Sequence, residues 1–173
     1  MIMAPSLRKL ALTAHVTSSV GWLGAAAAFL AVAIVGLTSR DARTVRGAYL
    51  VMEPAAWLVL VPLAFASLLT GLVMSLGTTW GLFRHYWVLV KLLITVFCTV
   101  ILLVYMGTFR VMATLAADPG ADLGLVRNGS PVIHAVLALL LLLVNAALSV
   151  YKPRGMTGYG RRKQREERVV LVP

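Results

Sequence analysis

Four long apolar stretches dominate this sequence, at about 10–37, 48–76, 85–110 and 132–151. A bilayer core about 30 Å thick is crossed by roughly 20 apolar residues in a helix, and each stretch reaches that length. The first is longer than the roughly 7–15 residues of a signal peptide's apolar region, which favours an uncleaved helix. We therefore predict an all-α fold, a four-helix transmembrane bundle with short loops over residues 1–151, followed by a basic C-terminal tail at 152–173.

The composition excludes an ordinary soluble domain. Hydrophobic residues make up 60% of the chain and charged residues 13%, with a mean hydropathy of +0.90; soluble domains have about 45–50% and about 25%. The net charge is +10, yet the basic residues form no groove interleaved with aromatic residues, so we predict no nucleic-acid partner. The single cysteine, Cys98, excludes an intramolecular disulfide and a cysteine-based metal site.

The basic residues instead predict the orientation in the membrane. Seven of the 16 Lys and Arg residues follow the last apolar stretch: Lys152, Arg154, Arg161, Arg162, Lys163, Arg165 and Arg168. With four spans both termini share one side, which carries ten basic residues near the spans against five on the other. The excess predicts a multi-pass protein of the cell membrane with both termini in the cytoplasm. The tail is also expected to contact anionic lipid headgroups or a partner, unless it serves only as an orientation signal.

A few polar residues lie at depths where a bilayer disfavours them. Such residues usually face the interior of a bundle and mark function. The helical rise predicts two layers at different depths in the membrane. The layer nearer the cytoplasmic side, the inner layer, contains His15, Lys91 and Asn145, and the outer layer contains Glu53 and His134. His15 is also in helical register with Trp22, as expected for one inward face.

Each of these residues also has an ordinary interpretation. Lys91 is near enough to a helix end to extend its amine to the headgroups. His134 fits an interfacial residue bonded to the preceding loop, and Glu53 fits a partner of Arg46 or His134. The alternatives remain open at the level of sequence.

Two further features of the spans concern helix shape and packing. Pro54 and Pro62 in the second span predict a kink, or a carbonyl at Leu58 that is offered to a ligand. Small residues on the first two spans, among them Gly24 and Gly71, allow close helix contacts within one chain or between chains, so a homo-oligomer or a larger membrane complex stays open.

Two short motifs resemble known bacterial membrane proteins. In the first span His15 is followed by six residues, Trp22 and then Gly24, and in the third Trp87 is followed by three residues, Lys91 and Leu92. The first motif resembles helix one of the membrane-bound, oxygen-independent protoporphyrinogen oxidases and of related copper-resistance membrane proteins, and the second resembles helix three of the oxidases. Over about residues 8–151 the chain is most similar to an uncharacterised family of four-span bacterial integral membrane proteins.

The resemblance implies a b-type haem held by His15 and Lys91, with a redox role in tetrapyrrole metabolism. Trp22 and Trp87 would then be packing walls, and Asn145 would orient a ligand. A different class of function is a non-enzymatic membrane scaffold or accessory subunit, in which the polar residues only lock the helix registers. Movement of protons or small solutes along the polar axis is a third alternative.

Overall fold

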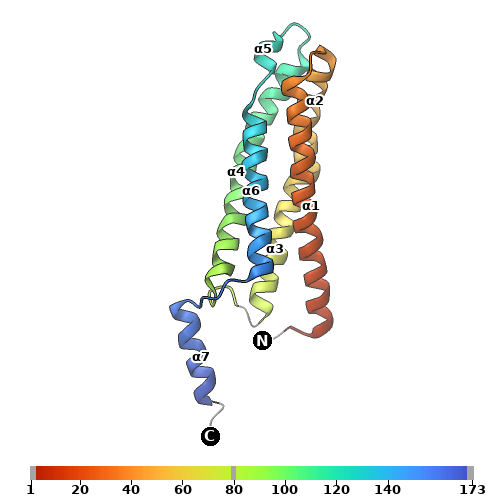
Figure 1. The fold of residues 1–173 in the computed structure, drawn as a ribbon. Helices are drawn as coiled ribbons and strands as arrows, with labels where there is room; N and C mark the ends of the chain where they lie inside the picture. The colour runs from red at the N-terminus through yellow and green to blue at the C-terminus, as the bar shows by residue number, and fades with distance from the viewer. Residues whose placement is uncertain (1–2, 79–80, 171–173) are drawn as a thin grey trace.

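The computed structural model describes residues 3–78 and 81–170, with side chains up to residue 166 (Figure 1). The described residues form helices and no strand, apart from one isolated bridge between His85 and Met156. The elements in chain order are α1 (Pro5–Thr38), α2 (Ala42–Ala55), the π-helix η1 (Ala56–Leu60), α3 (Val61–Gly77), α4 (Tyr86–Ala117), α5 (Leu123–Val126), α6 (Ser130–Tyr151) and α7 (Gly158–Val170). The predicted all-α four-helix bundle is confirmed.

Four helical segments of the described chain are long and apolar enough to cross a membrane: Pro5–Thr38, Ala42–Gly77, Tyr86–Ala117 and Leu123–Tyr151. They match the four apolar stretches, and the protein is accordingly a multi-pass membrane protein. The helices run beyond the apolar residues at several ends, and a side-chain cap can satisfy the backbone of a helix end in the polar interface. Asp41 provides one such cap, accepting hydrogen bonds from the backbone N–H groups of Arg43 and Thr44.

The bundle is a ring in which neighbouring spans are also consecutive in the chain. α1 packs against α3 and α6, and α4 packs against the same two helices, so α1 and α4 face one another across the bundle. α1 begins and α6 ends at the same end of the bundle, and α5 lies at the opposite end (Figure 1). This arrangement determines which side chains meet, because helices on a diagonal share few direct contacts.

The second span changes helical form between its two prolines. Pro54 lies inside α2 and Pro62 in the first turn of α3, with η1 between them. The Val61 N–H donates to the Ala56 carbonyl, five residues back, as in a π turn. Proline has no N–H to donate, so each of the two prolines interrupts the backbone hydrogen bonds of the helix. The wider π turn lies between these two interruptions. The Leu58 side chain is 76% exposed, and a ligand at its carbonyl stays a prediction.

The buried core lies along the contacts among α1, the second span and α4. Tyr49, Met52 and Val45 are fully buried near the end that carries α5. Many large apolar side chains are exposed instead, such as Val104 at 72% and Leu93 at 67%. An exposed apolar surface of this extent is unusual for a water-soluble chain and fits contact with lipid tails.

Candidate functional site

The His15 ring lies between α1 and α3. Its Nδ1 is 3.1 Å from the Thr70 hydroxyl oxygen, and the Thr70 hydroxyl donates to the Ala66 carbonyl in its own helix. Since the single hydroxyl hydrogen is used there, the Thr70 oxygen accepts from His15, and Nδ1 carries the hydrogen. Nε2 is then the ring nitrogen that carries the lone pair. The ring rests on Gly71, where a Cβ would come within 3.2 Å of His15 Cε1.

Hydroxyl groups next to His15 link α1 to α3 by hydrogen bonds. The Ser19 and Ser67 hydroxyl oxygens are 2.8 Å apart, and the Ser18 hydroxyl donates to the His15 carbonyl at 3.1 Å. Two helical turns beyond His15 on the predicted inward face, Trp22 is 4% exposed. The predicted register of His15 and Trp22 thus places both side chains against neighbouring helices.

Lys91 belongs to a second polar network, between α4 and α6. Its Nζ donates to the Ser149 hydroxyl and lies 5.9 Å from the centroid of the Trp87 ring. Asn145 Nδ2 donates to the Thr95 hydroxyl at 2.9 Å, and that hydroxyl donates to the Lys91 carbonyl at 2.8 Å. Asn145 Oδ1 is buried without a described hydrogen-bond partner. Lys91 and Asn145, predicted in one layer, share this network.

His15 and Lys91 lie on α1 and α4, the two helices that face one another across the ring. They bond to different neighbours, Thr70 on α3 and Ser149 on α6. The donor set suits haem iron, since imidazole and neutral amine nitrogens both ligate it and the His15 ring already has the hydrogen bond that an axial histidine usually makes. Among the described residues no group of three His, Cys, Asp or Glu side chains could hold a bare metal ion.

Glu53 and His134, predicted in the outer layer, are not partners of one another. Glu53 Oε1 lies 3.7 Å from Arg110 Nε, and neither Arg46 nor His134 is its partner. The reason is the order of helices in the ring: Glu53 is on the second span, which neighbours α4, whereas His134 is on α6 across the diagonal. His134 instead bonds within its own helix, with Nδ1 2.9 Å from the Ser130 carbonyl oxygen. The interpretation of His134 as bonded near the preceding loop fits this geometry.

Of the second-span residues around His15, Thr70 was not identified from the sequence, whereas Gly71 was expected to allow close helix contacts. Ser67, Thr70 and Gly71 together form the surface that receives His15 and Ser19. Placing such residues in a membrane helix costs little free energy, and they do not stand out in a hydropathy profile. Their spacing of three and four, which puts them on one helix face, was the available signal.

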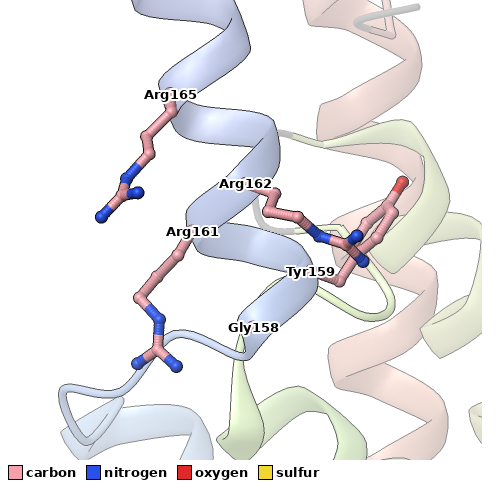
Figure 2. Close-up of a pocket in the computed structure, with 5 residues that line it drawn as sticks. All are labelled: Gly158, Tyr159, Arg161, Arg162 and Arg165. Carbon is pink, nitrogen blue, oxygen red and sulfur yellow. The ribbon is translucent and has the colours of Figure 1, made fainter.

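A cavity of about 240 Å³ lies farther along the bundle, beyond Trp22. Its walls come from α1, α4 and α6 and the end of η1, and neither His15 nor Lys91 lines it. A second hollow, of about 390 Å³, lies on the tail helix α7. Figure 2 shows Arg162 beside the Tyr159 ring, with Arg161 and Arg165 projecting from the other side of that helix.

No known protein family matches the chain, and no curated protein or solved structure was found to be similar to it. The function is therefore argued from the side chains and their surroundings.

Proposed function

We propose that this membrane protein binds a b-type haem through His15 and Lys91. The observation that carries the proposal is the hydrogen bond from His15 Nδ1 to Thr70. A bond at Nδ1 sets the tautomer and the ring orientation and leaves Nε2 as the ligating atom, as is usual for axial histidines. Gly71 supports this placement, because its lack of a side chain gives the ring room on α3.

Lys91 supplies the second nitrogen. An amine ligates iron only in its neutral form, and the described partners of Nζ are the Ser149 hydroxyl and the Trp87 ring. No described carboxylate pairs with Lys91 to hold it as an ammonium ion. Release of one hydroxyl partner would free the amine for ligation.

The surrounding residues have supporting roles in this proposal. Trp22 and Trp87 would form walls against which the haem packs. The unpaired Oδ1 of Asn145 would accept a hydrogen bond when the network rearranges. A bound haem would supply one-electron transfer, which fits a redox role in tetrapyrrole metabolism. The chain's own part is to orient His15, free Lys91 and exclude water with its apolar helices.

Purification in mild detergent, with and without added haemin, tests the proposal by absorption spectroscopy. The unaltered protein should bind one haem per chain, and His15→Ala and Lys91→Leu should each abolish the six-coordinate spectrum. Matched controls are His85→Ala, at the start of α4, and Lys163→Leu, on the exposed tail helix. Thr70→Val should keep binding but weaken it on the order of 10–100-fold. A colourless protein that takes up no haemin, or an unchanged spectrum in His15→Ala, would refute the proposal.

A scaffold or accessory subunit is the second candidate function. The observation in its favour is that both polar networks join helices without any ligand: His15 and Ser19 bond α3, and Asn145 bonds α4. Such bonds between membrane helices average about 0.6 kcal/mol each. If Lys91→Met and Asn145→Leu lowered stability while no haemin bound to any variant, the scaffold would be favoured.

The basic tail supports an orientation with both termini in the cytoplasm and contact with anionic lipid. α7 starts at the end of the bundle and leads away from it (Figure 1), so the beginning of this helix, with Arg161 and Arg162, is its part nearest the membrane spans. Charge reversal by Arg161→Glu with Arg162→Glu should reduce association with vesicles containing phosphatidylserine, and high salt should do the same. Labelling of Lys163→Cys from the cytoplasmic side only would support the orientation, and labelling from outside would overturn it.

A further inference from the structure

The cavity beyond Trp22 has apolar walls and a mouth at the lipid surface. Trp22, Phe29 and Leu60 contribute to its inner wall. Phe97 and Leu137, which also line it, are 56% and 54% exposed and lie on α4 and α6 at the surface of the bundle. A molecule dissolved in the bilayer can therefore reach the cavity from the side, between these two helices.

One part of the cavity wall is polar. His134 stacks on Tyr105 with ring centroids 4.1 Å apart and an angle of 29° between the planes. The Tyr105 hydroxyl donates to the Ser130 hydroxyl at 2.7 Å, and Phe109 meets the Tyr105 ring edge-on at 4.9 Å. The last two contacts hold the Tyr105 ring, which covers one face of His134.

The hydrogen bonds of His134 define what the cavity can recognise. A carbonyl oxygen only accepts, so His134 Nδ1 carries a hydrogen and donates it to the Ser130 carbonyl. In the neutral ring Nε2 is then an acceptor, and no described residue bonds it. A ligand with a hydroxyl donor would satisfy this atom while its apolar part fills the cavity.

The volume limits the ligand to one ring. An engineered apolar cavity of about 150 Å³ holds benzene, so 240 Å³ accepts a substituted single ring but not a tetrapyrrole. We propose that this cavity binds an aromatic hydroxyl compound, a phenol or the head group of a membrane quinol, whose hydroxyl donates to His134 Nε2. This site is separate from His15 and Lys91 and does not depend on haem binding.

The test compares p-cresol with toluene, which lacks only the hydroxyl, on the full-length protein in lipid nanodiscs. Binding is followed by the ¹⁵N resonances of the labelled histidine rings, because the His134 Nε2 signal reports the proposed bond directly. We expect p-cresol to bind about 10-fold more tightly than toluene, the size of effect expected for one good hydrogen bond. Only the His134 signal should move strongly, with those of His15 and His85 unchanged.

Three variants make the test specific. His134→Phe keeps an aromatic ring on Tyr105 and should remove the preference for p-cresol, measured by saturable ligand binding, while toluene still binds. Ala138→Phe fills the cavity and should abolish binding of both, whereas Leu143→Phe, on the lipid-facing side of the same helix, should not. Thermal unfolding of each variant identifies any that fail to fold, and Ala135→Phe then replaces Ala138→Phe.

A quinol with a ten-carbon tail distinguishes the two sources of the ring. Tighter binding of the tailed quinol than of p-cresol assigns the site to a membrane quinol, and binding of p-cresol alone assigns it to a small phenol. Equal affinity of the unaltered protein for p-cresol and toluene would overturn the proposal. Unchanged p-cresol binding in the folded cavity-filled variant would also overturn it.

Discussion

The imidazole of His15 on α1 lies against the backbone of Gly71 on α3, and a Cβ at residue 71 would stand 3.2 Å from the ring. The adjacent residue, Thr70, accepts the hydrogen bond from the same ring. One turn of α3 therefore provides both the space and the hydrogen bond that orient His15.

Gly71→Val should displace the His15 ring. The added methyl groups overlap the imidazole, and overpacking of this kind costs roughly 1–3 kcal/mol. We expect lower thermal stability in detergent and an altered ¹⁵N signal of His15 Nδ1, because the bond to Thr70 is lost. Gly107→Val is the matched control, since a Cβ at residue 107 meets nothing within 4 Å. Equal effects of the two substitutions would contradict the proposed close approach.

Tyr49→Phe should loosen the connection before α6. The Tyr49 hydroxyl donates to the Asn128 carbonyl and accepts from the Asn128 N–H, both at 3.0 Å. Removal of the hydroxyl leaves two backbone groups without a partner, at a cost of about 1–3 kcal/mol. Thermal unfolding measures the loss, and Tyr151→Phe, at a side chain that is 82% exposed, should change stability little.

Arg46→Lys should increase the mobility of the chain after α4. The Arg46 guanidinium donates to several backbone carbonyls there, including those of Ala116 at 3.3 Å and Ala121 at 2.7 Å. A lysine ammonium cannot bridge them in the same way, and we expect a loss on the order of 1 kcal/mol. Faster amide hydrogen exchange over residues 116–121 would show it. Arg43→Lys, on the same helix, should leave that exchange unchanged.

Thr44→Val should raise the pKa of Asp41. The Thr44 hydroxyl donates to Asp41 Oδ2 at 2.6 Å, and this bond, followed by the backbone N–H of Thr44, holds the pKa of Asp41 below its ordinary value. The cap's contribution to stability is present above the unfolded-state pKa and is lost as the pH falls through the lower folded-state pKa. A ¹³C carboxyl titration should show a higher pKa in Thr44→Val, while Thr44→Ser keeps the wild-type pKa.

Much of the architecture follows from hydropathy. Each apolar stretch became one span, because a helix in lipid must satisfy its backbone bonds internally, and four spans put both ends on one side. Lys91 and Asn145, which the helical rise predicted in one layer, lie in one network with Thr95 and Ser149. Depth along the membrane is a one-dimensional property and can be counted along the chain.

The partners across the bundle could not be obtained in that way. Glu53 and His134 were predicted to share a depth, but they lie on diagonal spans, and Glu53 pairs with Arg110 on the adjacent helix instead. The cavity between α4 and α6 likewise depends on how side chains from four spans fill the space. Hydropathy thus determines that these helices cross a membrane and at what depth each polar residue lies, because both depend on length and solvation. The rotation and order of the helices determine which residues meet, because those depend on packing between segments distant in the chain.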